Sequence, residues 1–218
     1  MNDESRRVRV VCFDWGGVIL RICRSFEEGV AAAGLELRDG YDAADLYDVR
    51  RKLSHDYQIG AIEDADFFTR VSDSLRGLYS ADEIAAIHDA WLVGEYKGVG
   101  DIMDELNASP SVKTAMLSNT NARHWSRREH DFPTCGKAEL PHASHLLGLA
   151  KPDPAIYAAF TKAVAVDSDQ ILFFDDLAEN IEAARTAGWQ AVHIDHTTET
   201  ADQIRLGLKN RGIAISPR

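Results

Sequence analysis

Residues 10–20 read VVCFDWGGVIL, and this stretch decides which fold the chain can adopt. It continues an apolar run that covers 8–13 (VRVVCF), and such a run is typical of a strand buried on both faces of a parallel sheet. The run ends at Asp14, and two glycines follow one residue later. An aspartate beside glycines is a common turn, but the carboxyl end of a buried strand is also where open α/β sheets bind ligands.

Three more short apolar runs follow further along the chain, TAML at 114–117, ILFF at 171–174 and AVHI at 191–194. Helical patterns separate the last three runs, at 154–166 and at 179–189. Strands that alternate with helices indicate an α/β fold whose parallel sheet is covered by helices on both faces. We therefore expect a Rossmann-like, doubly wound parallel sheet.

The long segment 21–93 has a different pattern, with four helical stretches and no buried-strand run. We interpret it as a helical cap inserted over the site, and we expect 1–20 and 94–218 to form the α/β core domain. The alternative is that these helices continue the layers on the sheet.

Polar side chains follow the apolar runs at the points where strands should end. These residues are Asp14, Ser118, Asn119, Asp175 and Asp176. Asn180 lies one helical turn beyond the last pair, and Lys151 of the KPDP sequence precedes the helical pattern at 154–166. The carboxyl ends of parallel strands meet at one edge of a sheet, so we expect these groups to lie close together. Carboxylates suit a hard ion such as Mg²⁺, which prefers a few carboxylates plus water and substrate phosphate. Two adjacent carboxylates at a buried strand end repel each other unless a cation is present. The set therefore predicts a cation and a phosphate bound side by side.

Composition narrows the possible partners. The formal net charge of −11 over 218 residues disfavours nucleic acid as a partner. No apolar stretch approaches the length of a membrane span, and the opening MNDESRRVRV is charged where a signal peptide would be apolar. The cysteines Cys12, Cys23 and Cys135 form no CxxC motif and cannot all pair. We expect a cytoplasmic protein with no membrane partner, either a monomer or a homodimer.

Four motifs, taken in order, resemble those of the haloacid dehalogenase superfamily of hydrolases. They are FDWGG, LSNTN, KPDPAIY and FFDDLAENIEAARTAG, and together they span residues 10 to 189. The second and fourth are also similar to a sugar-phosphatase-like subgroup that shares features with the phosphatase domain of soluble epoxide hydrolase. The resemblance implies a hydrolase with a core of the predicted fold.

The resemblance also implies roles around a magnesium ion. Asp14 would be the nucleophile that forms an aspartyl-phosphate, and it would ligate Mg²⁺ as well. The backbone carbonyl of Gly16 and the carboxylate of Asp175 would be further ligands. Asp176 would bind the metal directly or through water, and Asn180 would orient the cluster.

Three residues are implied to hold the phosphoryl group. Ser118 and Asn119 would bind its oxygens, and Lys151 would neutralise charge on the nucleophile and the phosphoryl group. The expected substrate is a small phosphorylated metabolite of the sugar phosphate class.

Gly16 departs from the superfamily pattern, because most of its phosphatases have DxD at this motif and this chain has DWG. The second aspartate is a general acid and base, and such help is worth roughly 10²–10⁴-fold in rate. A Mg²⁺-dependent phosphatase is the first interpretation. A metal-free 2-haloacid dehalogenase and a catalytically weak or silent binding protein are the alternatives.

Several other polar residues have no assigned role from sequence. His124 and Trp125 follow the second motif and either face substrate or pack the helix. Arg21 and Arg24 follow the first motif closely and either reach polar groups of a substrate or, as is commoner, lie at a hinge or on the surface. Candidates for the inner face of the inserted segment are His55, Tyr57 and Gln58. The spacing of His130, Cys135, His142 and His145 matches no closed zinc pattern, and we predict no zinc site there.

Overall fold

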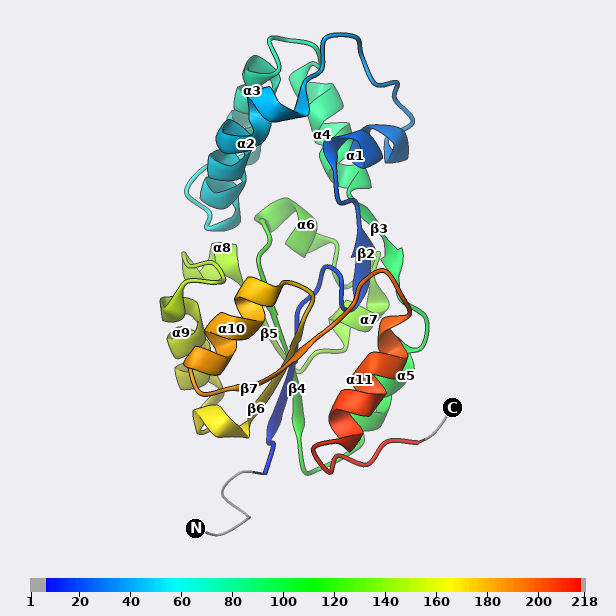
Figure 1. Ribbon diagram of the computed structural model, residues 1–218, viewed down its shortest axis with the longest axis vertical. Coiled ribbons are helices and arrows are strands. Elements are labelled where there is room, and N and C mark those ends of the chain that lie inside the picture. The colour runs from blue at the N-terminus through cyan, green and yellow to red at the C-terminus, as the bar shows by residue number, and fades with distance from the viewer. Residues whose placement is uncertain (1–6, 217–218) are drawn as a thin grey trace.

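A five-stranded parallel sheet lies at the centre of the chain (Figure 1). The computed structural model describes residues 7–216, with side chains throughout except at residues 43–48. The strand order is β5-β4-β1-β6-β7, and every neighbouring pair is parallel. The strands are β1 (Val10–Phe13), β4 (Lys113–Ser118), β5 (Leu140–Ala143), β6 (Ile171–Asp175) and β7 (Gln190–His193). The predicted doubly wound α/β sheet is confirmed.

The register of the sheet brings the motif residues to one edge. Phe13 of β1 lies level with Met116 of β4 and with Phe174 of β6. The side chains that follow these positions therefore emerge from adjacent strand ends. The four predicted strands are present, but β5 was missed. It is a short, mostly half-buried edge strand that contains Pro141, and proline is tolerated at an edge because no ladder bond is lost there.

Helices cover both faces of the sheet, and β1 shows why. Its side chains alternate, so Val10 and Cys12 join one apolar cluster while Val11 and Phe13 join the other. The first cluster includes residues of α9 and α10, and the second includes residues of α5 and α11. These helices are α5 (Val99–Asn107), α9 (Pro154–Val164), α10 (Ala178–Thr186) and α11 (Thr200–Lys209). Shorter helical turns are α6 (Ala122–Ser126), α7 (Pro133–Gly136), α8 (Ser144–Leu147) and a 3₁₀ turn at Ser168–Gln170.

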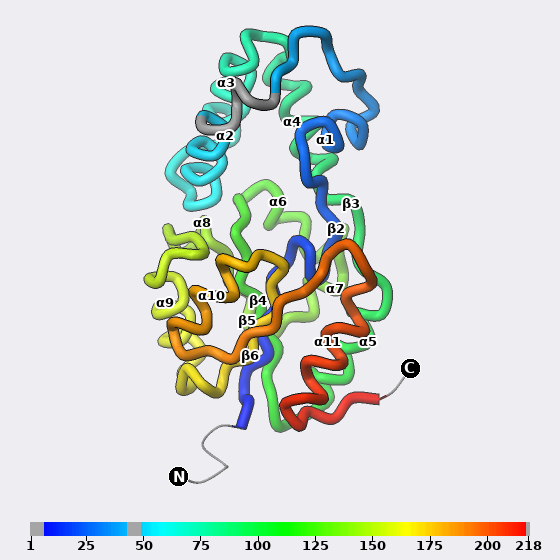
Figure 2. Tube along the Cα trace, viewed as in Figure 1, coloured from blue at the N-terminus to red at the C-terminus, as the bar shows by residue number. Residues whose placement is uncertain are grey.

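Four further helices gather in a separate lobe beyond the carboxyl ends of the strands (Figures 1 and 2). They are α1 (Phe26–Ala32), α2 (Ala43–Gln58), α3 (Asp64–Ser74) and α4 (Ala81–Ala90). The lobe has an apolar cluster of its own, centred on aromatic residues such as Phe26 and Tyr79. Two of its helices, α1 and α4, begin at serines that cap them. Ser80, for example, forms a capping box with Glu83 at the start of α4.

Two short strands join the lobe to the sheet. β2 (Leu20–Ile22) and β3 (Leu92–Glu95) pair in antiparallel fashion. The sequence pattern predicted helices alone between 21 and 93, and these strands were missed because they are short and mostly half-buried, so no continuous apolar run marks them. Ile19 and Tyr96 extend the connection through a backbone hydrogen bond of 2.9 Å.

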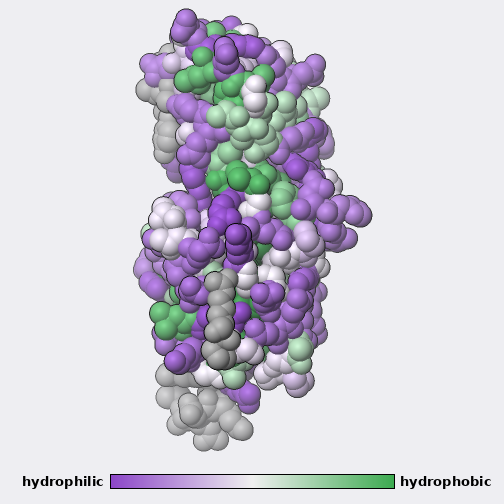
Figure 3. Space-filling view, turned by 90° about the vertical axis from the view of Figure 1, so that its right-hand side faces the viewer, coloured by the Kyte–Doolittle hydropathy of each residue, from purple (hydrophilic) through white to green (hydrophobic). Residues whose placement is uncertain are grey.

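The outer surface is mostly hydrophilic on the side that carries β2 and β3 (Figure 3). Hydrophobic atoms on this side gather on the helical lobe and near its junction with the sheet (Figure 3). Among the described residues, no helix combines the length and the apolar character needed to cross a membrane. All three cysteines are free and buried.

Candidate active site

The charged residues of three motifs meet at the ends of β1 and β6. Asp14 directly follows β1, and Asp175 is the last residue of β6. Lys151 Nζ lies 2.9 Å from Asp14 Oδ1 and 2.7 Å from Asp175 Oδ2. All three residues are buried, with Asp175 fully enclosed. One ammonium group therefore bridges two carboxylates that would otherwise repel each other.

Asn119 holds Lys151 in this position. Its side-chain Nδ2 donates to the backbone carbonyl of Lys151 at 2.7 Å, and its Oδ1 accepts from the backbone N–H of Lys151 at 2.8 Å. The loop then enters α9, where Asp153 caps the helix and Pro154 begins it. The resemblance implied that Asn119 binds phosphoryl oxygens, but in this structure its side chain is engaged in positioning the lysine. Ser118, the last residue of β4, is buried at the same edge.

Asp175 is held by a second amide. Asn180 Nδ2 lies 3.0 Å from both carboxylate oxygens of Asp175, and the backbone N–H of Leu177 donates to Asp175 Oδ1 at 2.8 Å. The other amide atom, Asn180 Oδ1, is buried without a hydrogen-bond partner in the described part of the chain. A buried unpaired oxygen is costly, so this atom is available to a ligand or an ordered water.

Asp176 has a partner that the sequence did not reveal. Arg24, which follows β2, reaches back so that its Nη1 lies 2.7 Å from Asp176 Oδ2. His196 Nδ1 lies 3.6 Å from the same oxygen. Gly17 makes room for this pair: its φ of +79° is left-handed, and a Cβ there would overlap both Asp176 and Arg24. Arg21 instead pairs with Glu199 near the surface.

The enclosed carboxylates change the ionisation of the site. Burial raises the pKa of Asp14 to about 7, Lys151 opposes this rise, and the charges of Asp175 and Asp176 add to it. Burial alone lowers the pKa of Lys151, but Asp14 and Asp175 outweigh it and raise the pKa above its ordinary value. Lys151 is therefore positively charged, whereas its charge does not fully offset the effect of burial on the Asp14 carboxylate.

The acidic cluster fits a hard divalent cation. Asp14, Asp175 and Asp176 each offer an oxygen, and these oxygens lie within 4.8 Å of one another. When all three carboxylates are ionised, they exceed the two positive charges of Lys151 and Arg24 by one negative charge. The donors are all oxygen, as Mg²⁺ prefers.

Gly16 borders this cluster, and the side chain of Ile22 lies close to its Cα. A Cβ at position 16 would lie 2.9 Å from Cδ1 of Ile22 in β2. An acid at this position would therefore contact a hydrocarbon side chain that belongs to the connection with the lobe.

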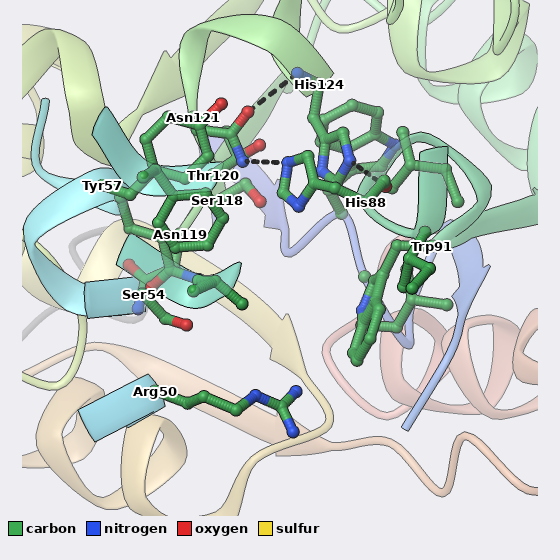
Figure 4. Close-up of a pocket in the computed structure, with 18 of the residues that line it drawn as sticks. Arg50, Ser54, Tyr57, His88, Trp91, Ser118, Asn119, Thr120, Asn121 and His124 are labelled. Carbon is green, nitrogen blue, oxygen red and sulfur yellow. Dashed lines mark hydrogen bonds between the residues drawn. The ribbon is translucent and has the colours of Figure 1, made fainter. Parts of the chain in front are cut away.

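A cavity of about 220 Å³ lies between the strand ends and the lobe (Figure 4). Its lining includes Gly16, Ser118 and Asn119 from the strand-end loops. Tyr57 and Gln58 line it from the lobe, whereas His55 is not among the described lining residues.

Two histidines meet across the junction of core and lobe. His124 of α6 stacks on His88 of α4, with ring centroids 3.8 Å apart and planes 5° from parallel. His124 Nε2 lies 2.7 Å from the backbone carbonyl of His88. Burial lowers the pKa of His124 to about 4 and that of His88 well below its ordinary value, so both rings are neutral. Trp125 instead packs in the core, edge-on to Trp15.

Ion pairs between Arg123 and two aspartates of the lobe lie beside the stacked histidines. The Arg123 guanidinium contacts Asp89 of α4 at 2.5 and 2.6 Å, and it contacts Asp64 of α3 at 3.3 Å. Arg127 Nη1 donates to the backbone carbonyl of Asp89 at 2.7 Å. The segment after β4 therefore lines part of the cavity and also contacts two helices of the lobe, α3 and α4.

Residues 8–188 match the family model for haloacid dehalogenase-like hydrolases. The chain belongs to this family. Over 73 residues it is 40% identical to a phosphatase from Mycobacterium tuberculosis, and the match covers 34% of each chain. The chain therefore spans about a third of the length of that curated relative.

Solved structures of the family share the fold. A family enzyme from Bacteroides thetaiotaomicron, crystallised with magnesium and inorganic phosphate, is 20% identical with a TM-score of 0.72, and the match covers 91% of this chain and 100% of that one. An L-2-haloacid dehalogenase from Xanthobacter autotrophicus is 18% identical with a TM-score of 0.61, covering 95% of this chain and 85% of that one.

Proposed function

We propose that the protein is a Mg²⁺-dependent phosphatase of small phosphorylated metabolites that acts through an aspartyl-phosphate on Asp14. The observation that carries the proposal is the buried bridge from Lys151 to Asp14 and Asp175, beside a third carboxylate. Negative charge in excess of the lysine supports a bound cation, and a cation together with a lysine supports a bound phosphate. The M. tuberculosis phosphatase and the B. thetaiotaomicron magnesium and phosphate complex support the same class.

The contacts of Asp14 support one of its two oxygens as the nucleophilic atom. Its Oδ1 accepts from the backbone N–H of Trp15 at 2.7 Å and lies 2.9 Å from Lys151 Nζ. These contacts engage one oxygen, so Oδ2 attacks the phosphorus atom while Oδ1 stays bound. The attack forms an Asp14–phosphate bond as the bond from phosphorus to the alcohol oxygen breaks, and that oxygen takes its proton from a water molecule. The hydroxide left behind then attacks phosphorus, which frees the Asp14 carboxylate and releases inorganic phosphate.

The other residues bind and stabilise. Lys151 and Ser118 hold phosphoryl oxygens, while Asn119 keeps Lys151 in place. Asp14, Asp175 and Asp176, with the Gly16 carbonyl, hold Mg²⁺, which when bound offsets charge on the phosphoryl oxygens. Lys151 remains positively charged throughout, so it stabilises the additional negative charge of the transition state.

The helical lobe acts as the cap over this site in the same proposal. It faces the strand ends (Figure 1). The stacked histidines His88 and His124 attach it there (Figure 4), and so do the ion pairs of Arg123. A covered site excludes bulk water and admits a small substrate rather than a polymer.

The test is phosphate release from a panel of esters, including p-nitrophenyl phosphate and sugar phosphates, with and without Mg²⁺. We expect Mg²⁺-dependent release in the wild type and only background release in Asp14→Asn. Asp101→Asn, which changes an exposed aspartate of α5, is the matched control and should keep wild-type activity.

Two results would contradict the proposal. If no ester released phosphate and the wild type matched Asp14→Asn, the chain would be a silent binding protein. Chloride release from 2-haloacids without metal would identify a dehalogenase instead.

A further inference from the structure

The guanidinium of Arg24 borders the acidic cluster from the connection with the lobe. Its Nη1 lies 2.7 Å from Oδ2 of Asp176, and the Asp176 side chain is 2% exposed whereas that of Arg24 is 30% exposed. Asp176 is one of the three carboxylates whose oxygens gather at the strand ends. Arg24 therefore brings a positive charge to a carboxylate that the cluster also offers to a cation.

The backbone at Gly17 allows Arg24 to come this close. A Cβ on Gly17 would overlap Oδ2 of Asp176 and would lie 2.6 Å from Nη2 of Arg24. One guanidinium nitrogen thus contacts Asp176, while the other lies against the loop that follows Asp14 and Gly16. Because the Asp14 carboxylate and the Gly16 carbonyl are proposed ligands of the same ion, the charge of Arg24 lies beside the ligand set.

The position of Arg24 suits a role toward the carboxylate rather than toward the substrate. Arg24 is not among the described residues that line the cavity, although Ile22, two positions earlier, is among them. The backbone N–H of Arg24 donates to Oε2 of Glu28 at 2.7 Å, and Glu28 belongs to the first turn of α1. The main chain of Arg24 is thus tied to the lobe, while its side chain reaches Asp176 in the core.

A guanidinium and a divalent cation make opposing demands on one carboxylate. The ion pair with Arg24 engages Oδ2 of Asp176 in a charge-assisted hydrogen bond, and a guanidinium beside a bound cation repels it. Solvent at the partly exposed Arg24 reduces this repulsion without removing it. Loss of Arg24, by contrast, would leave Asp176 buried without this counter-ion and so favour a cation in its place.

We propose that Arg24 competes with Mg²⁺ for the Asp176 carboxylate and thereby sets the cation affinity of the site. The proposal rests on the phosphatase function, which takes Mg²⁺ as the resident cation, and it adds the residue that regulates its binding. Arg24 acts through Asp176 and not on the reacting atoms. Because Arg24 follows β2, the affinity depends on where the connection with the lobe places the guanidinium.

The test measures the Mg²⁺ dissociation constant of the full chain by isothermal titration calorimetry at constant ionic strength. We expect Arg24→Gln to lower this constant by about 10-fold, the order expected when one partly screened charge beside the ion is removed. The matched control is Arg21→Gln, which removes the same charge from β2 at a residue that pairs with Glu199 near the surface. This control should keep the wild-type constant.

A double-mutant cycle shows whether Arg24 acts through Asp176. In the Asp176→Asn background, Arg24→Gln should no longer tighten Mg²⁺ binding. An undiminished effect in that background would show that Arg24 acts by long-range charge, and it would overturn the competition. Equal constants for wild type and Arg24→Gln overturn this proposal and leave the phosphatase function intact. Failure of both proteins to bind Mg²⁺ overturns both.

Thermal unfolding separates competition from a purely structural role of Arg24. Arg24→Gln should have a lower Tm than the wild type without Mg²⁺, because a buried carboxylate loses its counter-ion. Added Mg²⁺ should raise the Tm of this variant more than that of the wild type, because tighter binding stabilises the folded state more. Arg24→Lys keeps the charge but lacks the guanidinium fork, and its Mg²⁺ response should fall between the two. A Tm difference between wild type and Arg24→Gln that is the same at every Mg²⁺ concentration overturns the competition.

Discussion

An acid placed at position 16 would meet the side chain of Ile22, which would have to shift to admit it. Gly16→Asp alone would place a Cβ 2.9 Å from Ile22 Cδ1, with Cγ2 and Cγ1 at 3.5 and 3.6 Å. Overpacking of this kind costs about 1–3 kcal/mol and displaces side chains. Ile22→Ala removes all three of these atoms. We therefore predict that Gly16→Asp/Ile22→Ala gains activity where Gly16→Asp alone gains little.

The size of the gain follows from the chemistry of the leaving group. General acid catalysis contributes roughly 10²–10⁴-fold, which corresponds to about 3–5 kcal/mol of activation free energy. An alkyl alcohol is a poor leaving group and needs this proton, whereas p-nitrophenolate leaves readily without it. We expect about a 10²-fold rise with an alkyl ester such as glucose 6-phosphate and a much smaller rise with p-nitrophenyl phosphate. Ile22 is half-buried, so its truncation costs about 2 kcal/mol of stability, near the lower end for such changes.

The assay measures steady-state phosphate release from the two esters with Mg²⁺ present. The matched control is Gly16→Asn/Ile22→Ala, which has the same shape but cannot donate an acidic proton. Comparison of the two double variants cancels the effect of the enlarged cavity. If the aspartate variant is no faster than the asparagine variant on the alkyl ester, residue 16 does not face the leaving oxygen and the reasoning is refuted.

Two further predictions concern stability. Gly17→Ala should lower the free energy of unfolding by about 3 kcal/mol, because it combines left-handed backbone strain with overlap against Asp176. The control is Gly77→Ala, since Gly77 has a similar φ of +72° and no atom within 4 Å of an added Cβ. We expect this control to lose only about 1 kcal/mol when both variants are unfolded with urea. Burial lowers the pKa of His124 from 6.5 to about 4, so its ring is neutral in the folded protein at pH 5 to 7. As the pH falls below 6.5, this histidine binds a proton in the unfolded chain but not in the folded one, and the free energy of unfolding therefore decreases. We expect His124 to contribute a loss of about 2 kcal/mol between about pH 7 and pH 5, and the loss should be smaller by that amount in His124→Gln. Parallel pH profiles for wild type and His124→Gln would contradict this assignment.

The sheet and the residues at its edge could be predicted from sequence because both depend on local patterns. A buried parallel strand is read from a short apolar run, and the residue after it is then placed by the backbone alone. Asp14, Ser118 and Asp175 all follow from this rule, and the sheet order brings them together. The rule fails for β5, whose proline and half-exposed side chains resemble a loop.

The contacts between lobe and core could not be predicted, because each depends on side chains far apart in the chain. Arg24 and Asp176 are separated by 152 positions, and no spacing in the sequence relates them. The sequence does show Gly16 and thus an absent acid, but it cannot show that the side chain of Ile22 lies close to this position. Asn119 illustrates the same limit at shorter range. From sequence its polar side chain is a candidate phosphate ligand, but in the fold it hydrogen-bonds to the backbone of Lys151, 32 positions away.

Arg24 and Ile22 lie on the same short connection, and this links the chemistry of the site to the position of the lobe. Ile22 ends β2 and lies close to Gly16, while Arg24 follows it and neutralises Asp176. Pairing of β2 with β3 fixes both side chains relative to the strand ends. A change in the path of this connection would alter the charge of the acidic cluster and the shape of the cavity together. The acidic cluster and the cavity therefore depend on this connection as well as on the motif residues.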